Sequence, residues 1–492
     1  MTRSSTIEEG YDQLPYPGVP VLKTHPVTLA TLARVFGLSP APVSRCRVLE
    51  LGCADAENLL PMAHGLPSSD FIGVDLSSVQ LDLGRRMAEQ LKLGNLKLLH
   101  CDLTRLDLNS LGSFDYIICH GVFSWVSDEV RAAILRLFQA CLNPGGVGFL
   151  SYNSFPGWHL LEMLRGMLQR HCSPNLSPRE QMREARALFA LLEHSSTVAP
   201  NDVEAALKPE LLRLKQRSDA HVFHEYLTEH NKAFYFEELA AMLKLNGLQH
   251  LANAVPETMT PANYGPEVAR YVAESHEETE GQQRLDMMLG RGFNSALICR
   301  ADEPVNRTLD PDVIAEMWFD ASVSPDPANS PEVAVTVLSS SGISALIEDK
   351  DLKVALSLLN KAQPRGLQFE ALFEGVIAQT PSDRPHEDRR LRLLGSLVRL
   401  FFGAVVGMAT WHPPMVSRPG EHPLASGLAR LQAKEGGPVA SQWHQPVTLE
   451  AEALALLAVL DGQSSVADLI EQFGEEVPAQ LLRFAMGGVL LA

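Results

Sequence analysis

Small and acidic residues follow a short apolar run in the segment Glu50-Leu-Gly-Cys-Ala-Asp-Ala56, and Asn58 comes just after it. Small residues let a backbone turn sharply and approach a ligand, with the N–H groups of the following helix facing it. A diphosphate-binding loop would read GxGxxG, whereas this loop has Gly52 followed by Ala54 and Ala56. The loop is therefore poorly suited to a diphosphate. It suits the amino-acid tail of S-adenosylmethionine, because nearby acidic residues could bind the ammonium group of that tail. A tight strand–helix turn without a ligand is the alternative.

Two further acidic residues end apolar runs in the same way. Asp75 can accept both ribose hydroxyls of an adenosine, as the acid of a dinucleotide fingerprint does. Its alternative role is a helix N-cap, which Ser77 could fill equally well. Asp102 could receive the adenine amino group, with Leu103 against the ring. Together the three loops predict a nucleoside-type cofactor. The residues expected to hold it are Glu50, Gly52, Cys53, Ala54, Asp55, Asn58, Asp75, Leu76, Asp102, Leu103 and His120.

The elements that must position these loops alternate between apolar runs and segments with helical spacing. Strands are expected at residues 47–52, 71–75, 96–102, 115–120 and 146–152. Such alternation predicts right-handed βαβ crossovers and a parallel sheet, whose ligands bind beyond the carboxyl ends of the strands. Strand-like runs return only at 247–252 and 294–300, after a long helical region. The predicted fold is a doubly wound α/β sheet of seven strands with a helical insertion.

The rest of the chain divides at a linker rich in Asp, Pro and Ser over residues 301–332 and at a turn-rich break that begins near His412. After that break, helix, strand, helix, turn and helix follow in the order of a winged-helix module, an α+β unit. The predicted domains are 1–171 with 225–301 for the cofactor-binding sheet, 172–224 for the inserted helical domain, 302–410 for a middle domain and 411–492 for a C-terminal winged-helix-like domain. The insertion cannot bury both faces of its helices alone, so we expect a homodimer through it.

The composition indicates a globular protein and argues against nucleic acid as a partner. The 492 residues are 46% hydrophobic and 20% charged, with a formal net charge of −18. A strongly acidic protein repels phosphate backbones, and no basic patch is visible to override that field.

The cysteines and the apolar stretches indicate in which cellular compartment the protein works. Seven cysteines show no metal-ligand spacing and suit a reducing environment, and the N-terminus has no signal-peptide pattern. The most apolar stretch, 391–411, is interrupted by Arg392 and Arg399, so we interpret it as a buried helix. We therefore expect a cytoplasmic protein with no bound metal and no membrane span.

Four segments carry a resemblance to a known family: Glu50-Leu-Gly-Cys-Ala54, Gly73-Val-Asp-Leu-Ser77, Phe114-Asp-Tyr-Ile-Ile-Cys-His-Gly-Val-Phe-Ser-Trp125 and Ser151-Tyr-Asn-Ser-Phe-Pro-Gly-Trp-His159. They resemble class I methyltransferases with a methyltransferase regulatory domain and are similar to the rickettsial-type lysine methyltransferases that modify outer-membrane proteins. The last two segments are specific, and the resemblance covers nearly the whole chain, most weakly at 302–385. It implies S-adenosylmethionine as cofactor, a protein lysine as acceptor and a regulatory or dimerisation role for the insertion.

One position departs from that family, which usually has glycine where this chain has Ala56. The extra methyl group would tighten the cofactor loop, and alanine is tolerated there if its φ stays negative. We therefore expect the loop to bind the cofactor despite this substitution.

The loop after the fourth predicted strand argues against several chemical classes of methyl acceptor. It reads His120-Gly-Val-Phe-Ser124, without the Asn/Asp-Pro-Pro-aromatic box with which enzymes that methylate adenine or glutamine grip a planar amine or amide. It also lacks the Pro-Cys nucleophile that cytosine C5 chemistry needs. An amine of another kind fits what remains. A small-molecule N- or O-methyltransferase and a cofactor-binding regulatory module without turnover stay open as alternatives.

Methyl transfer is an in-line displacement, in which the nucleophile lies about 3–3.5 Å from the methyl carbon. A lysine must first lose its proton, and burial among aromatic rings lowers its pKa while the ring faces still tolerate the cation. We expect Tyr152 or His120 to contact the amine and Trp125 to form a channel wall. Core packing is the alternative for Trp125 and Trp158. The residues expected at the acceptor site are Tyr16, His120, Trp125, Tyr152, Asn153 and Trp158. His159 is interpreted as a structural hydrogen-bond partner.

An HxxHE run, formed by His221, His224 and Glu225, could suggest a metal site. Its order is not that of a zinc-binding helix and no third ligand is evident, so we expect no metal there. The resemblance instead implies that His224 could close over the acceptor. In the C-terminal module, the helix predicted at 465–473 contains no Lys or Arg, which favours recognition of protein over DNA.

Overall fold

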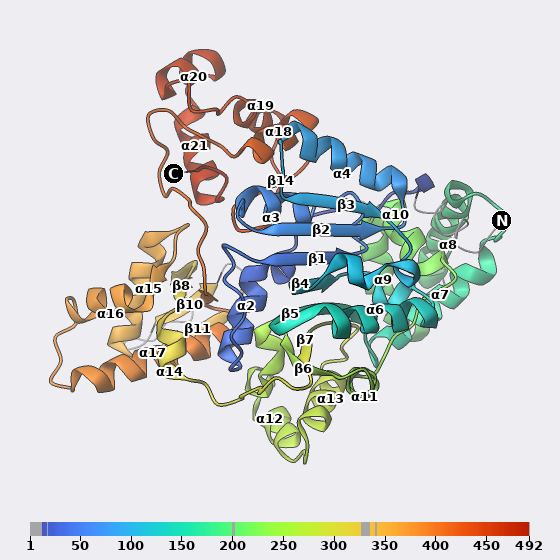
Figure 1. Cartoon of the computed structure of the whole chain (residues 1–492), viewed down its shortest axis with the longest axis horizontal. Coiled ribbons are helices and arrows are strands. Elements are labelled where there is room, and N and C mark those ends of the chain that lie inside the picture. Colours follow the sequence, from blue (N-terminus) through green and yellow to red (C-terminus); the bar gives the residue numbers. More distant parts are fainter. Residues whose placement is uncertain (1–11, 17, 199–201, 326–334, 340–341, 492) are drawn as a thin grey trace.

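The computed structural model describes residues 12–16, 18–198, 202–325, 335–339 and 342–491. At its centre lies a seven-stranded sheet in the order β3-β2-β1-β4-β5-β7-β6 (Figure 1). Its strands are β1 (Arg47–Leu51), β2 (Asp70–Asp75), β3 (Leu96–His100), β4 (Phe114–Cys119), β5 (Leu142–Asn153), β6 (Leu248–Asn253) and β7 (Phe293–Arg300). The first five are parallel, and β7 is antiparallel to β5 and β6. The predicted doubly wound, seven-stranded fold is confirmed.

The strands form where the sequence is apolar because helices cover both faces of the sheet. The helices on one face are α2 (Pro26–Val35), α3 (Leu59–Gly65) and α4 (Ser78–Gln90), and those on the other are α6 (Asp128–Cys141) and α11 (Phe236–Leu245). Successive strand residues point to opposite faces. Val48 accordingly packs in the first core and Leu49 in the second.

Parallel pairing brings the carboxyl ends of the strands to one edge of the sheet. Glu50 of β1 pairs with Gly73 of β2, and Asp75 of β2 pairs with His100 of β3. On the other side of β1, Glu50 pairs with Ile118 of β4. The loops that follow these strands therefore share the edge at which open α/β sheets bind ligands.

Between β5 and β6 the chain leaves the sheet and forms a helical unit. Its elements are α7 (Trp158–His171), α8 (Pro178–Val198), α9 (Asp202–Gln216), α10 (Asp219–Val222) and a π-helical turn, η4 (Phe223–Leu227). The unit has an apolar core of its own that extends from Leu164 to Tyr226, beyond both ends of the predicted insertion. Its helices lie on the side toward which the arrows of β2 and β3 point (Figure 1). Two more helices, α12 (Pro266–Ala273) and α13 (Glu278–Met288), separate β6 from β7.

The middle region combines two small three-stranded sheets with helices, drawn in yellow and orange in Figure 1. The sheets contain β8 (Trp318–Asp320), β12 (Leu367–Gln368) and β13 (Gly407–Ala409), and β9 (Val323–Pro325), β10 (Val335–Ser339) and β11 (Ser344–Ile347). The helices are α14 (Pro311–Ala315), α15 (Lys350–Ala362), α16 (Phe369–Ile377) and α17 (His386–Phe402). The helix α17 starts before the apolar stretch at 391–411, because Glu387 and Asp388 in its first turn suit a helix N-terminus.

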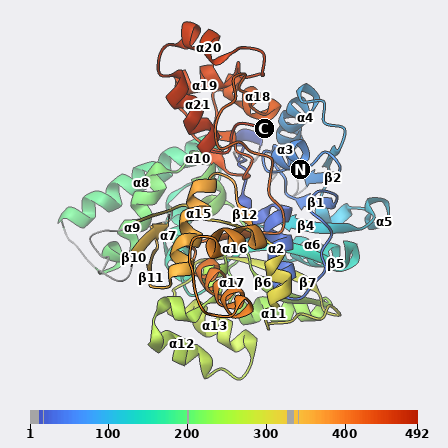
Figure 2. The same ribbon diagram turned by 90° about the vertical axis from the view of Figure 1, so that its left-hand side faces the viewer.

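The C-terminal module has its own core and comprises α18 (Gly427–Glu435), β14 (Val439–Ala440), β15 (Pro446–Val447), α19 (Ala451–Leu457), α20 (Val466–Phe473) and α21 (Val477–Met486). The sequence prediction included these elements except β14 and α21. Both views place this module beside α3 and α4 of the central domain (Figures 1 and 2). The module therefore lies against the helix that begins directly after the first predicted cofactor loop.

Candidate functional site

The loop after β1 turns by means of residues in the left-handed region of backbone space. The φ angles of Gly52, Ala54 and Ala56 are +75°, +51° and +61°. A Cβ atom on Gly52 would lie 2.4 Å from Cγ2 of Val122, so only glycine fits there. The condition under which alanine was expected to be tolerated at position 56, a negative φ, is not met. The loop must reverse within a few residues, so that the Ala56 N–H donates to the Cys53 carbonyl, and this turn overrides the preference of alanine.

Glu50 lies buried at the end of β1 with one carboxylate oxygen held and the other free. Its Oε1 accepts a hydrogen bond from Nδ2 of Asn58 at 2.8 Å. Its Oε2 is buried and has no hydrogen-bond partner among the described residues. Burial is the main cause that raises the pKa of Glu50 to about 8, and the negative charges of Asp75 and Asp55 raise this pKa further. The hydrogen bond from Asn58 acts in the opposite direction. An ammonium placed at Oε2 would satisfy this oxygen and stabilise its charge.

Asp75 joins the first loop to the second. Its Oδ2 accepts a hydrogen bond from the Ala54 N–H and its Oδ1 one from the Ser77 N–H, both at 2.8 Å. The N-cap of α4 is Ser77, whose hydroxyl accepts from the N–H of Gln80, so the capping alternative for Asp75 does not hold. Because a carboxylate can accept about four hydrogen bonds, two positions remain for ribose hydroxyls.

The remaining predicted cofactor residues surround the same edge. Asp102 caps the short helix η2 (Leu103–Arg105) and accepts from the N–H and hydroxyl of Thr104, with Leu103 partly buried beside it. Asp55 accepts from the N–H of Gly18, so the N-terminal segment lies across the first loop. Cys53 is buried, and the Leu76 carbonyl contacts His100. The strand register thus gathers the predicted loops at one edge of the sheet.

His120, after β4, is held as a neutral ring. Its Nδ1 lies 2.9 Å from the hydroxyl of Ser151. Burial lowers the pKa of His120 to about 3, and the nearby charge of Lys23 adds to this. Lys23 donates to the hydroxyl of Ser295 at 3.0 Å and lies over the ring of Phe293. Sequence reasoning missed this half-buried ammonium, which stands next to the predicted cofactor residues and suits a carboxylate.

A second polar group forms where the helical unit meets the loop after β4. Nε1 of Trp125 donates to Oε2 of Glu225 at 3.1 Å. The hydroxyl of Tyr16 lies 3.0 Å from Nδ1 of His221, and its ring lies 6.2 Å from that of His224. Burial raises the pKa of Glu225 to about 8, against the Trp125 hydrogen bond and the charge of Arg165. The structure thus brings two predicted acceptor residues, Tyr16 and Trp125, together with a carboxylate from the HxxHE run.

Tyr152 and Asn153, at the end of β5, point in different directions. The Tyr152 ring is fully buried, contacts the ring of Phe234, and has a raised pKa because of burial and the charge of Asp286. Among the described residues, no hydrogen bond or ring contact joins Tyr152 to Trp125 or Glu225. Asn153 is connected with the Trp125–Glu225 group through Asn231. The side-chain amide of Asn153 donates to Oδ1 of Asn231 at 3.2 Å, and the side-chain amide of Asn231 donates to the backbone carbonyl of Glu225.

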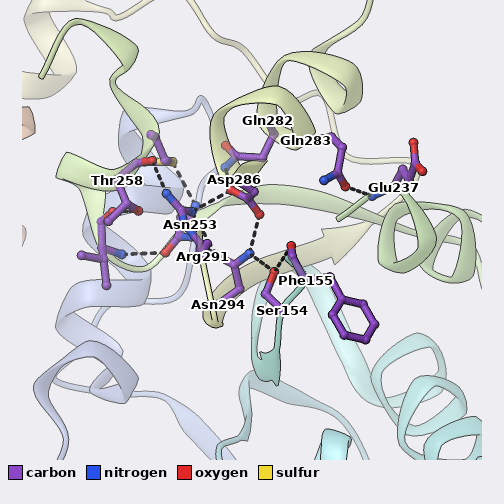
Figure 3. Close-up of polar contacts among 12 residues, drawn as sticks. Ser154, Phe155, Glu237, Asn253, Thr258, Gln282, Gln283, Asp286, Arg291 and Asn294 are labelled. Atoms are coloured by element: carbon purple, nitrogen blue, oxygen red, sulfur yellow. Dashed lines mark hydrogen bonds and ion pairs between the residues drawn. The ribbon is translucent and has the colours of Figure 1, made fainter. Parts of the chain in front are cut away.

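A buried polar network supports the loop after β5 (Figure 3). Asp286 of α13, fully buried, pairs with Arg291 at 3.1 Å and accepts from the amide of Asn294 at 2.7 Å. The Asn294 amide also contacts the hydroxyl of Ser154, and Asn253 donates to its oxygen. A fully hydrogen-bonded buried network rigidifies its surroundings. This network fixes the backbone that follows Asn153.

The aromatic and histidine residues of that loop have structural positions. Trp158 is buried at the start of α7, consistent with core packing. His159 is exposed, stacks on Phe155 at 4.0 Å between ring centroids and contacts Glu162 and Tyr235. Within the described ranges, no cluster of three or more His, Cys, Asp or Glu side chains could hold a metal ion. In the same ranges no helix combines the length and apolarity that crossing a membrane requires.

Three parts of the chain match known domain families. Residues 48–146 match a methyltransferase domain, and residues 218–300 match a predicted methyltransferase regulatory domain. Residues 421–491 match the C-terminal winged helix domain of PKMT. The order of these matches agrees with the sheet, the segment that returns to it, and the final module.

Two relatives come from Rickettsia prowazekii. Uncharacterized protein RP789 is 34% identical over 64% of this chain, which spans only 57% of that protein's length. Uncharacterized protein RP028 is 36% identical over 46% of this chain and 91% of its own length.

Among solved structures, PKMT2 from Rickettsia typhi superposes with a TM-score of 0.86 at 24% identity, over 97% of this chain and 100% of that one. Its complex with AdoHcy gives a TM-score of 0.85 at 25% identity over the same shares. AdoHcy is the demethylated form of S-adenosylmethionine, and the Gly52 cradle and the unpaired Oε2 of Glu50 fit such a cofactor. The chain therefore belongs to the S-adenosylmethionine-dependent class I methyltransferases that carry a methyltransferase regulatory domain.

Proposed function

We propose that this protein transfers a methyl group from S-adenosylmethionine to the side-chain amine of a lysine in a protein substrate. The observation that carries the proposal is the carboxylate of Glu225, which Trp125 holds beside Tyr16 at the carboxyl edge of the sheet. A carboxylate among aromatic rings suits an alkylammonium, because the charge pairs with the oxygen and the stem packs on the rings. The abbreviation PKMT, carried by the matching structure and winged-helix family, denotes protein lysine methyltransferases and supports this choice.

We assign the cofactor to the crevice at the ends of β1, β2 and β3. Oε2 of Glu50 would receive its ammonium, Lys23 its carboxylate and Asp75 its ribose hydroxyls. Asp102 and Leu103 would hold the adenine. The cofactor supplies an electrophilic methyl group on a sulfonium. The protein's own part is to hold the acceptor in line with it and to exclude water.

Glu225 is proposed to prepare the acceptor. In the free protein its raised pKa of about 8 means that it holds a proton near neutral pH. An arriving lysine ammonium displaces that proton and pairs with the carboxylate. As the lysine nitrogen loses its own proton, toward Glu225 or water, its lone pair forms the new N–C bond while the C–S bond breaks. Trp125 and Tyr16 are proposed to hold the stem of the lysine.

Mass spectrometry of a lysate treated with trideuteromethyl-labelled S-adenosylmethionine and the protein tests this proposal. Labelled methyl groups on lysines of one or a few proteins are expected, and a Glu225→Gln variant should deposit far fewer. A label found only on small molecules would favour the small-molecule N- or O-methyltransferase. No label with intact cofactor binding would favour the regulatory module without turnover.

We further propose that the protein works in the cytoplasm as a homodimer formed through the helical insertion. Exposed apolar side chains on α8 and α9, at Leu191, Val203 and Leu212, support the pairing. The free cysteines support a reducing compartment, and the net charge of −18 favours a basic protein substrate over nucleic acid. Sedimentation of the wild type and of Leu191→Glu tests the dimer, which the variant should weaken.

A further inference from the structure

A chain of hydrogen bonds leads from the C-terminal module to the cofactor crevice. Nε2 of His444 lies 2.8 Å from Oδ1 of Asn58, and Nδ2 of Asn58 lies 2.8 Å from Oε1 of Glu50. The three residues are only 3%, 8% and 4% exposed, in the same order. His444 follows Asn58 by 386 positions in sequence, so a separate module contributes this contact.

The direction of each hydrogen bond follows from one backbone group. The N–H of Val21, which can only donate, lies 3.0 Å from Oδ1 of Asn58 and identifies that atom as the amide oxygen. The amide nitrogen therefore faces Glu50 and donates to Oε1. Nε2 of His444 must then carry a proton and donate to the same oxygen as Val21. His444 thus donates to Asn58, and Asn58 donates to Oε1 of Glu50. The other carboxylate oxygen of Glu50 has no hydrogen-bond partner among the described residues.

The backbone at His444 is held in an unfavourable conformation. Its φ is +55°, and a non-glycine residue in the left-handed region is uncommon and costly. The ring lies 5.1 Å from that of His25, which caps α2, so both imidazoles occupy the junction between module and sheet domain. Burial lowers the pKa of His444 well below its usual value, with the charge of His25 adding to this, so the ring stays a neutral donor.

The same junction has a second polar contact that offers a control. Nε2 of Gln432, on α18, donates to Oε2 of Glu57 at 2.8 Å. Glu57 directly precedes Asn58, yet among the described residues it forms no hydrogen bond with Glu50. A variant at Gln432 therefore disturbs the junction without breaking the chain that leads to the cofactor carboxylate.

We propose that His444 is a positioning residue of the cofactor site, which fixes Asn58 so that Glu50 keeps one oxygen turned toward the cofactor's ammonium. The C-terminal module thus completes a site built mainly by the sheet. This inference goes beyond the proposed function, because it concerns cofactor affinity and holds for any acceptor.

Calorimetric titration of the full chain with two ligands tests it. AdoHcy carries the amino-acid tail, and 5′-methylthioadenosine has the same nucleoside without amino and carboxyl groups. His444→Ala should weaken AdoHcy binding about tenfold and leave methylthioadenosine binding within about twofold of wild type. His444→Gln, whose amide nitrogen can donate from nearly the same place, should restore most of the AdoHcy affinity. Gln432→Ala should change neither affinity by more than about twofold.

Other outcomes would overturn the proposal. Unchanged AdoHcy affinity in His444→Ala would do so, and so would an equal loss for both ligands, which indicates general damage to the fold. If His444→Ala does not fold, Asn58→Asp takes its place, because a carboxylate beside Glu50 removes the donor while keeping the shape. That variant must then show the same selective loss for AdoHcy. A wild-type protein that binds neither ligand would refute the cofactor assignment and this inference, whereas failure of lysine methylation alone leaves this test intact.

Discussion

The proposed cofactor half and the proposed acceptor half of the site are held together over very different distances along the chain. In the cofactor half, Asp75 binds the backbone of Ser77 two residues away, and Glu50 binds Asn58 eight residues away. In the acceptor half, Trp125 reaches Glu225 across 100 positions, and Tyr16 reaches His221 across 205.

Because of this difference, substitutions in the two halves should affect different properties of the protein. The cofactor half is fixed mainly by strands and the turns that follow them, and His444 of the C-terminal module adds one distant contact through Asn58. None of these parts belongs to the helical unit, so the cofactor half should persist when that unit is disturbed. The acceptor half exists only while that unit is docked against the loop after β4. Substitutions in the first half should therefore change cofactor affinity, and substitutions in the second should change turnover at constant cofactor affinity.

The largest effect is expected from Asp75→Ala. It removes the acceptor for the Ala54 and Ser77 N–H groups and for the ribose hydroxyls. Hydrogen bonds to a charged group contribute about 1.5–3 kcal/mol each, so the Kd for AdoHcy should rise by about a thousandfold in calorimetry. Ser77→Ala, which loses a helix cap and a hydrogen bond to Asp12 but keeps the backbone N–H that binds Asp75, is the control and should stay near wild type. A comparable Kd in the two variants would contradict the cofactor assignment of this crevice.

Glu225→Gln should act on turnover alone. The amide keeps the contact volume but loses the charge and the proton acceptor. General acid–base groups typically contribute about 10²-fold or more, so kcat should fall by about that factor while the Kd for AdoHcy stays unchanged.

The exposed Glu229, in the same segment, offers the matched control Glu229→Gln, which should keep wild-type turnover. A parallel loss of cofactor affinity in Glu225→Gln would show that the two halves are not separable.

Glu50→Gln should weaken AdoHcy binding about tenfold and change the number of protons released on binding. The pKa of Glu50 is raised from 4.5 to about 8, so between these values the folded free protein holds a proton that the unfolded chain lacks. Its contribution to stability is present below pH 4.5 and lost as pH rises through about 8. A bound ammonium favours the charged form.

Wild-type binding near neutral pH should accordingly release up to about one proton, and this release should vanish well above the raised pKa. Calorimetry in buffers of different ionisation enthalpy measures it, and Glu50→Gln should abolish it. Proton release that persists unchanged in the variant would assign it to another group.

The smallest effects are expected at Ala56. Ala56→Gly relieves a left-handed alanine, which costs about 1–2 kcal/mol, but also removes a buried methyl worth about 0.8 kcal/mol. Its free energy of unfolding should therefore stay within about 1 kcal/mol of wild type in urea titrations. Ala56→Val should lower both stability and AdoHcy affinity, because a β-branched residue does not tolerate this φ. A fully stable valine variant would contradict the loop geometry.

The sequence was informative where structure is local. Apolar runs predicted the seven strands because a sheet covered on both faces needs such runs, and the acids that end these runs could be placed on one edge. The sign of φ at Ala56 could not be predicted, because alanine ordinarily favours negative φ and the turn imposes the opposite. Glu225, Lys23 and His444 were missed as contacts of the site, since each arrives from a distant segment whose docking no local pattern records.

A crystal structure of this protein with bound AdoHcy would show whether the two groups of residues form one active site. We expect the ligand's ammonium within hydrogen-bond distance of Oε2 of Glu50, its ribose on Asp75, and its sulfur facing the space between Trp125 and Glu225. A ligand elsewhere, or a sulfur directed away from Glu225 with Glu50 still unpaired, would contradict this expectation.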